Sequence, residues 1–309
     1  MSGDALFGGI EAGGTKIVCA VGVGPDRILD RTTIPTTTPA ETLGQVIEYF
    51  RRQRAGGREI AALGVASFGP LDLTASSATF GHITTTTKPG WAGTDLVGML
   101  REGLDVPIVL DTDVNGAAYG EHRWGAGRGD DTVAYVTVGT GIGGGAIVHG
   151  LPLHGLLHPE MGHLHVQRHP ADDFAGSCPF HGDCLEGLAS GPAIERRAGR
   201  AAADLGPVHQ DMVLIEAHYL AQLMTSLIYM LMPHRIVVGG GVLNLAGLIE
   251  AVRAATTARL GKALDAVPAT GRMDEYIVSP GLGALSGVLG ALGLAEHEHR
   301  RLAAASLTL

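Results

Sequence analysis

The sequence predicts an α/β protein built from two similar halves. Residues 6–23 and residues 131–150 each have the pattern of a strand, a glycine-rich turn and a second strand. These two hairpins lie about 130 residues apart, which indicates a duplicated unit. A buried strand at 106–110 turns directly into a helix from about Asp113, as is typical of α/β domains. We therefore expect two α/β domains that close over one ligand.

The other elements follow from hydrophobic spacing and from turn residues. Apolar residues at helical spacing predict a helix over 40–54, and a strand over 60–73 ends in a Gly-Pro turn. A loop of Gly, His, Pro and Asp fills 149–184. The expected elements after it are helices from about 191, over 209–231 and over 245–264, strands at 235–243 and 276–280, and a terminal helix from about 282. We place the domain boundary near 113–115, where strand meets helix.

Composition and charge exclude several classes of protein. The chain has 309 residues, 47 of them glycine, and a net charge of −9, which argues against nonspecific nucleic-acid binding. The first residues lack a basic segment, so we expect no signal peptide, and no apolar stretch has the length of a membrane span. Of the three cysteines, two lie six residues apart, which favours a metal and a reducing compartment over disulfides. These features predict a cytoplasmic protein that binds neither nucleic acid nor membrane.

Three glycine clusters are candidates for nucleotide binding. The first, Glu11–Lys16, combines an acid, two glycines, a threonine and a lysine, which suits a phosphate better than a plain hairpin turn does. The second, Gly139–Gly145, contains G-x-G-x-x-G, but the sequence after it predicts a strand, whereas a dinucleotide fold needs a helix there. The third, Gly239–Gly241, leaves bare backbone on which a flat base can rest, although a close-packed turn explains it equally well.

Two carboxylates follow the buried strand at 106–110. Ligands of open α/β sheets gather at the carboxyl ends of strands, so Asp111 and Asp113 are well placed to act on one. A kinase needs one carboxylate to accept a hydroxyl proton while the phosphates are held in line. Asp113 also stands where a helix N-cap is expected, and Asp111 is the competing candidate for the base.

The loop at 149–184 holds a candidate metal site. His163, Cys178, His181 and Cys184 supply two imidazoles and two thiolates, the set that tetrahedral Zn²⁺ favours in a closed, structural site. The alternative is two buried cysteines among surface histidines. A zinc protease is disfavoured, because the sequence from His158 to His163 lacks the adjacent His-Glu pair of H-E-x-x-H.

Six motifs in order resemble those of the ROK sugar kinases, and most closely of their fructokinase branch. They are EAGGTK at 11–16, TDVN at 112–115, GTGIGGG at 139–145, HPEMGH at 158–163, CPFHGDCLEG at 178–187 and VVGGGV at 237–242. The resemblance implies a duplicated actin/hexokinase-like (ribonuclease H-like) fold with a cleft between the domains. The implied domains are residues 1–114 plus about 291–309, and residues 115–290 with the zinc loop at 149–187.

The same resemblance implies the roles of individual residues. Asp113 is then the catalytic base, and His163 bridges a structural Zn²⁺ and the sugar. The implied sugar contacts are Thr112, Asp113, Glu160, His163 and Glu186. The implied ATP contacts are Glu11, Gly13, Gly14, Thr15, Lys16, Thr140, Gly141, Pro192, Gly239, Gly240 and Gly241. MgATP is the implied donor, and a homodimer is the implied assembly.

Three departures from the commonest family pattern favour fructose over glucose. Glu11 replaces the Asp that usually opens the first phosphate loop, and Thr112 replaces the Asn of many glucose-specific members. Cys178, His181 and Cys184 replace the usual three cysteines. We therefore expect phosphorylation of D-fructose to fructose 6-phosphate. The alternatives are a mannokinase or glucokinase, a non-catalytic sugar sensor and, least favoured, an NAD-dependent oxidoreductase.

Overall fold

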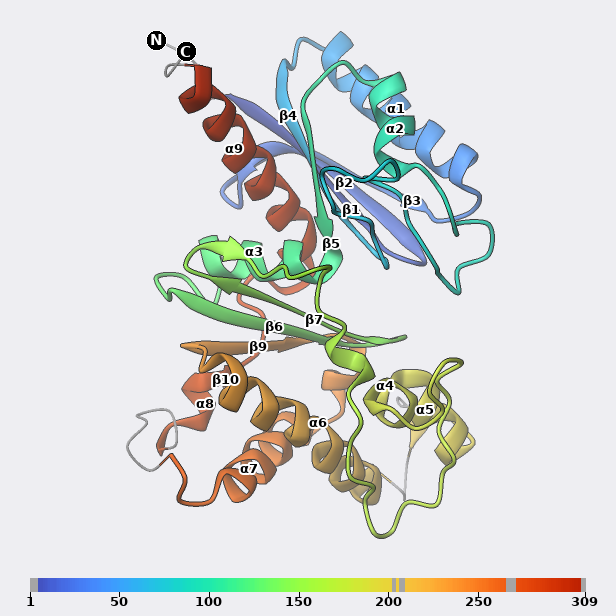
Figure 1. The fold of residues 1–309 in the computed structure, drawn as a ribbon, viewed down its shortest axis with the longest axis vertical. Coiled ribbons are helices and arrows are strands. Elements are labelled where there is room, and N and C mark those ends of the chain that lie inside the picture. Colours follow the sequence, from blue (N-terminus) through green and yellow to red (C-terminus); the bar gives the residue numbers. More distant parts are fainter. Residues whose placement is uncertain (1–4, 202–203, 206–208, 265–270, 307–309) are drawn as a thin grey trace. The chain divides into compact units, whose positions relative to one another are not determined.

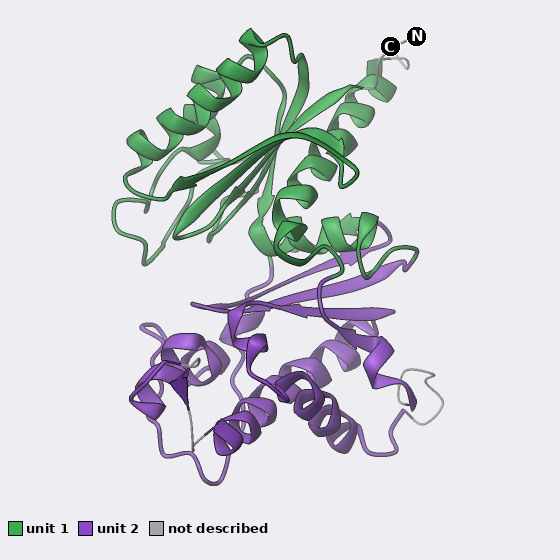
Figure 2. Cartoon of the chain, turned by 180° about the vertical axis from the view of Figure 1, so that it is seen from behind, with its two compact units in different colours: residues 1–129, 151–158, 281–309 green, residues 130–150, 159–280 purple. Residues whose placement is uncertain are grey.

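The structure is a computed structural model that describes residues 5–201, 204–205, 209–264 and 271–306 (Figure 1). Its contacts divide the chain into two compact units, coloured separately in Figure 2. Unit 1 comprises residues 1–129, 151–158 and 281–309, and unit 2 comprises residues 130–150 and 159–280. Each unit combines one sheet with helices, so the α/β prediction is confirmed.

The sheet of unit 1 has five strands in the order β3-β2-β1-β4-β5. Its antiparallel part consists of β1 (Leu6–Ala12), β2 (Lys16–Gly24) and β3 (Arg27–Pro35). On the other side of β1, the strands β4 (Ile60–Ser67) and β5 (Ile108–Thr112) run parallel to it. The carboxyl ends of β1, β4 and β5 therefore meet at one edge of the sheet.

The second sheet, whose strands belong to unit 2 except for β8, repeats this topology. Its order is β10-β9-β6-β7-β8, with β6 (Thr132–Val138) antiparallel to β7 (Ile142–Val148) and parallel to β9 (Arg235–Gly239). The end strands are β8 (Leu151–Pro152) and β10 (Ile277–Val278), and β10 runs parallel to β9. Hairpin β6–β7 thus takes the place that hairpin β1–β2 takes in unit 1, which bears out the duplication expected from the two glycine loops.

Helices cover the sheets on the faces that carry apolar side chains. In unit 1, α1 (Pro39–Ala55) and α2 (Leu96–Gly103) lie on one face of the sheet, and α9 (Ser286–Ser306) lies on the other (Figure 1). Helix α3 (Asp113–Trp124) packs against α9. The helices of unit 2 are α4 (Leu185–Ala189), α5 (Gly191–Ala198), α6 (His209–Leu231), α7 (Leu248–Leu260) and α8 (Met273–Tyr276).

Helices α3 and α9 touch backbone to backbone through glycines. A Cβ atom added at Gly290 would lie 1.6 Å from the carbonyl oxygen of Gly116, and one at Gly120 would lie 2.5 Å from that of Ser286. This close packing keeps both helices in unit 1. The compact units therefore change at 129/130 and 280/281, and unit 1 also takes residues 151–158, whereas the sequence-based domain ranges change at 114 and 290. Those ranges also include terminal residues outside the described part of the chain.

Two elements of unit 1 were not expected from the sequence. Strand β3 is the edge strand, and its side chains alternate between exposed and half-buried as far as Thr33, with only Ile34 buried, so its apolar signal is weak. Helix α2 is only eight residues long, but Asp95 caps it by accepting a hydrogen bond from the Gly98 backbone N–H. Among the described residues, no helix combines the length and the apolar character that a membrane span needs.

Candidate active site

Asp113 stands at the carboxyl end of β5, as the first residue of helix α3. The expectation that Asp113 is the N-cap is wrong, because Thr112 takes that position and its hydroxyl accepts a hydrogen bond from the Asn115 N–H at 3.1 Å. Threonine is one of the residues preferred at the N-cap of a helix, and Thr112 is buried. Thr112 therefore caps the helix, and Asp113 follows it in the first turn, where its Oδ1 accepts a hydrogen bond from the Val114 N–H at 2.9 Å.

The rival carboxylate, Asp111, is engaged inside the protein. It is 3% exposed, and its Oδ1 accepts hydrogen bonds from the Thr112 N–H at 2.7 Å and from the Asn115 side-chain amide at 2.8 Å. The His154 imidazole lies 3.1 Å away. Asp113, in contrast, is half-buried. The difference in burial thus favours a positioning role for Asp111 and a reactive role for Asp113.

The first glycine loop joins β1 to β2 at the same sheet edge. The Gly13 N–H donates to the carbonyl oxygen of Lys16 at 3.0 Å, which closes the turn and leaves Thr15 and Lys16 exposed. Thr36, at the end of β3, braces the turn from the side: its hydroxyl donates to the Gly13 carbonyl at 2.8 Å, and its N–H donates to the Thr15 carbonyl at 3.0 Å. The loop is thus preformed, with one hydroxyl and one cation pointing outward.

Glu11 lies beneath this turn, against the first residues of α9. Burial raises the pKa of its carboxyl to about 7, and the negative charge of Asp113 adds to the rise, while Lys16 and the Val288 backbone N–H lower it. Its Oε2 atom is buried and has no hydrogen-bond partner among the described residues. A buried carboxylate oxygen without a partner is costly, so it suits a group that is stabilised when a cation arrives.

Gly287 provides the space for the longer side chain of Glu11. A Cβ atom at Gly287 would lie 2.4 Å from Glu11 Cδ, so we expect Gly287→Ala to displace the carboxylate and to lower kcat by about tenfold. The stability should change little, because the preference of the helix for alanine over glycine, about 1 kcal/mol, offsets the cost of displacing the Glu11 side chain. The control is Gly44→Ala in α1, where an added Cβ meets no atom within 4 Å. Steady-state kinetics and melting curves check both, and equal kcat values in the two variants would contradict this role.

The second glycine loop, between β6 and β7, is held by two helices of unit 2. The Glu186 carboxylate in α4 accepts a hydrogen bond from the Ile142 N–H at 3.0 Å, and a Cβ atom at Gly141 would lie 2.6 Å from that carboxylate. At the start of α5, the Gly191 N–H donates to the Gly139 carbonyl at 2.8 Å. Pro192 follows in the first turn of α5. Because β7 follows this loop, the dinucleotide-fold interpretation of G-x-G-x-x-G is wrong.

The third glycine cluster follows β9, beside the second loop. Gly239 pairs with Thr137, so the ends of β6 and β9 lie next to each other. Gly240 has a φ of 95° and comes so close to Val138 that a Cβ atom would lie 2.2 Å from the Val138 carbonyl oxygen. Around Gly241, in contrast, an added Cβ meets nothing within 4 Å. The cluster therefore combines a close-packed turn with an open backbone surface, as both interpretations from the sequence require.

The four predicted metal ligands come together in unit 2. The ligand atoms of His163, Cys178, His181 and Cys184 all lie within 4.8 Å of one another. His163 Nδ1 lies 3.5 Å from Cys184 Sγ and 3.9 Å from Cys178 Sγ, and His181 Nδ1 lies 3.7 Å from Cys178 Sγ. A tetrahedral zinc ion with ordinary bond lengths would separate a nitrogen and a sulfur ligand by about 3.6 Å. The donor set and its spacing therefore fit such an ion.

His163 contributes only one of its two ring nitrogens to the metal cluster. Because Nδ1 faces the thiols, Nε2 is left to bind another group. Glu160 lies three residues before it, and burial raises the pKa of the Glu160 carboxyl, with a smaller opposing effect from His163. A carboxylate oxygen accepts hydrogen bonds, so Glu160 suits the hydroxyl of a sugar.

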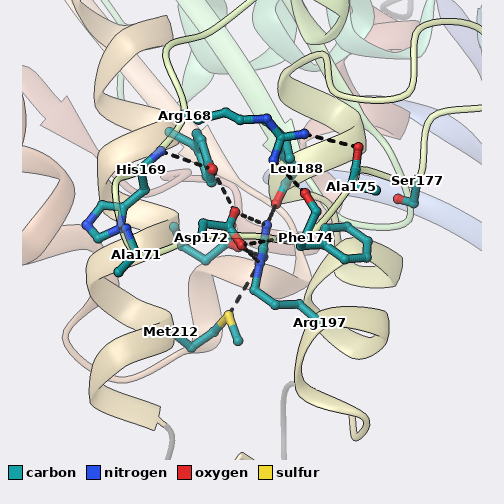
Figure 3. A network of polar contacts seen from close by, with 12 residues as sticks. Arg168, His169, Ala171, Asp172, Phe174, Ala175, Ser177, Leu188, Arg197 and Met212 are labelled. Carbon is teal, nitrogen blue, oxygen red and sulfur yellow. Dashed lines mark hydrogen bonds and ion pairs between the residues drawn. The ribbon is translucent and has the colours of Figure 1, made fainter.

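A buried ion network anchors the segment that follows His163 (Figure 3). Arg197 in α5 makes two hydrogen bonds of 2.9 Å to the Asp172 carboxylate and one of 2.6 Å to the Leu188 carbonyl. Its third partner is Glu216 in α6, at 3.1 Å, and Tyr219 donates to Asp172 at 2.6 Å. Since Leu188 belongs to α4, the helix that carries Glu186, this network fixes α4 against α5 and α6.

We expect Glu216 to make the stability of the protein pH-dependent. Burial raises the pKa of its carboxyl to about 8, although Arg197 lowers it. The unfolded chain ionises first, so between the unfolded and folded pKa values stability falls as pH rises. We expect Glu216→Gln to lessen the fall in melting temperature between about pH 6 and about pH 8 by about 5 °C. The exposed Glu195→Gln in α5 is the control, and equal pH profiles of the two variants would refute the assignment.

The sequence predictions thus fall into two sets. In unit 1 the structure gathers Glu11, the first glycine loop and Asp113 at one sheet edge. In unit 2 it joins Glu186 to the second glycine loop and brings the four predicted metal ligands together. Sequence reasoning missed Thr36 and gave no role to His154. Their partners lie 23 and 43 residues away, so no local pattern indicates them.

Comparisons with known proteins agree with this arrangement. The sequence model of the ROK family matches residues 7–298. A fructokinase of Zymomonas mobilis is 44% identical over 94% of this chain and 96% of its own. The crystal structure of a ROK hexokinase from Thermus thermophilus covers 96% of this chain and 99% of its own, at 31% identity and a TM-score of 0.79. A ROK glucokinase from Streptomyces griseus, solved with glucose and AMPPNP, covers 95% of this chain and 100% of its own, at 26% identity and a TM-score of 0.73. The chain belongs to the ROK family.

Proposed function

We propose that the protein transfers the γ-phosphoryl group of MgATP to the 6-hydroxyl of D-fructose, giving fructose 6-phosphate and ADP. The observation that carries this proposal is the 44% identity to a fructokinase over nearly the whole length of both chains. The site supports it independently: Asp113 is relieved of helix capping by Thr112, and it shares a sheet edge with a preformed glycine loop.

On the sugar side, Asp113 accepts the proton of the attacking hydroxyl. Positioning of that hydroxyl falls to Glu160, to Glu186 and to the Nε2 atom of His163. Glu186 also holds the second glycine loop through Ile142, so a sugar bound to it is tied to the loop that meets the phosphates. Thr112 is buried as the cap of α3, and we propose that it affects sugar choice chiefly by shaping the end of β5.

On the nucleotide side, the exposed turns of the two glycine loops receive the phosphates. Thr15 and Thr140 offer hydroxyls, Gly13, Gly14 and Gly141 offer backbone N–H groups, and Lys16 offers a cation. Pro192 and the backbone at Gly239–Gly241 border the adenosine. Glu11 holds the water shell of Mg²⁺, the ion that neutralises phosphate charge when MgATP is bound.

The metal cluster has a structural role in this proposal. Four protein ligands leave no open coordination position, which is typical of structural zinc. The cluster joins His163 to Cys184, so it restricts the distance in space between Glu160 and Glu186, which lie just outside these two residues in the chain. The four cysteine and histidine side chains bind zinc only while the thiols stay reduced, which supports a cytoplasmic location. From the family resemblance we also infer a homodimer.

A panel of hexoses at equal concentration tests the proposal. With fructose, glucose, mannose and N-acetylmannosamine, and with ADP release as the readout, we expect kcat/KM for fructose to exceed the others by at least about tenfold. A preference for glucose or mannose would replace the fructokinase assignment by another hexokinase of the same family. Binding of fructose without ADP release would indicate a sugar sensor.

A further inference from the structure

The segment 151–158 belongs to unit 1 although it lies in the chain between two parts of unit 2. It follows β7, begins with β8 and leads into Pro159 and Glu160. Two histidines in it, His154 and His158, lie outside the metal cluster. His154 contacts the end of β5, which leads into Asp113, and His158 contacts the turn after the neighbouring strand β4. We call residues 151–158 the strap.

His154 contacts the end of β5. Its Nε2 atom lies 3.1 Å from both carboxylate oxygens of Asp111 and 3.3 Å from the Asn115 side-chain amide. The hydrogen bond to Asp111 raises the pKa of the imidazole. Asp111 in turn accepts from the Thr112 N–H at 2.7 Å. His154 therefore acts on the residues immediately before Asp113 without lying in the chain next to it.

His158 contacts the turn that follows β4. It is 8% exposed, and its Nε2 atom accepts a hydrogen bond from the Leu71 N–H at 3.0 Å. A Cβ atom at Gly69 would lie 3.6 Å from the same nitrogen, so the imidazole lies directly against this turn. Because Ser67 in β4 pairs with Thr112 in β5, the turn at 68–71 starts beside the strand end that carries Asp113.

We propose that His154 and His158 are positioning residues for phosphoryl transfer, His154 for the strand end that carries Asp113 and His158 for the neighbouring turn at 68–71, which on this proposal contacts the sugar. This inference rests on the proposed function. Its physical basis is that each imidazole holds a segment at the sheet edge by a hydrogen bond between residues far apart in the chain. His154 bonds the Asp111 carboxylate over 43 residues, and His158 bonds the Leu71 N–H over 87 residues. A displacement of about 1 Å at such a place can cost about 100-fold in rate.

The two histidines should differ in which kinetic constant they affect. His154→Ala should lower kcat by about 10- to 100-fold and leave KM for ATP within about twofold, because the base is misplaced. His158→Ala should raise KM for fructose by about tenfold with a smaller change in kcat, because the turn loosens. The side-chain amide of glutamine lies about where Nε2 of histidine was. At position 154 its N–H can donate to Asp111, and at position 158 its oxygen can accept from the Leu71 N–H. We therefore expect His154→Gln and His158→Gln to restore most of each loss.

The control is His234→Ala in unit 2. His234 is exposed, and its Nδ1 also accepts from a backbone N–H, that of Thr132 at 3.3 Å, but at the amino end of β6. The His234→Ala variant should leave kcat and KM unchanged. If His158→Ala does not fold, His158→Asn serves, because its shorter amide does not reach Leu71.

Steady-state kinetics with fructose and ATP, together with a melting curve for each variant, decide the matter. Alanine variants with wild-type kcat and KM would overturn the proposal. So would losses that glutamine does not restore and that follow only the fall in melting temperature, since these indicate a purely structural role. The wild type is measured first: if it phosphorylates no sugar, the proposed function fails and the inference with it, whereas an active wild type with unaffected variants overturns the inference alone.

Discussion

Replacing Asp113 with Asn should lower kcat for fructose phosphorylation by a factor of about 1,000 while KM for fructose changes by less than about threefold. The amide cannot take the proton of the attacking hydroxyl, but it keeps the size of the side chain and its hydrogen-bonding capacity. The helix should be unaffected, because Thr112 caps α3 and Asp113 does not. The loss should therefore fall on the chemical step.

Two further variants serve as a control and a comparison for this result. Asp26→Asn changes an exposed carboxylate in the β2–β3 turn and should behave as wild type. Asp111→Asn should lower stability as well as activity, because Asp111 is buried and accepts several hydrogen bonds. Rapid-quench or coupled assays with melting curves separate the two effects. Near-normal turnover by Asp113→Asn would remove Asp113 from the role of base.

The second large effect concerns the metal cluster. We expect about one zinc per chain in the wild type and a large loss of zinc in Cys178→Ser, with a melting temperature lowered by about 10 °C or more. Without the ion, two thiols and two imidazoles that converge within 4.8 Å lose the bond that holds them. Chelation of the wild type should have the same effect on stability.

The third cysteine supplies the control for this experiment. Cys19 lies in the core of unit 1, fully buried and outside the cluster. Cys19→Ala should therefore keep the full zinc content, whatever its effect on packing. Elemental analysis of the purified variants provides the measurement. Full zinc content in Cys178→Ser would show that the ligand set is wrong.

Much of the fold followed from local patterns in the sequence. Both hairpins and the helix over 209–231 were predicted because their apolar periods are strong and their turns are rich in glycine. The edge strand β3 was missed, because an edge strand with one exposed side carries little apolar signal. The cap of α3 was assigned to Asp113 because Thr112 and Asp113 are both good caps in sequence, and only the end of β5 at Thr112 decides between them.

The site was predictable where it depends on motifs and not where it depends on distant pairs. The metal ligands and the glycine loops carry their own spacing signals. The bracing of the first loop by Thr36, the space that Gly287 leaves for Glu11, and the contacts of the strap all join segments far apart in the chain. Such pairs depend on the register of the sheet and on helix packing, which a single sequence does not reveal.

The central claim is that this chain phosphorylates fructose at its 6-hydroxyl with MgATP. The most direct test follows the purified wild-type protein with fructose and MgATP by ³¹P NMR, with an assay coupled through glucose-6-phosphate isomerase. The account predicts one fructose 6-phosphate for each ADP and no ADP release without sugar. Phosphate on another hydroxyl, sugar-independent ATP hydrolysis, or no product at all would contradict it.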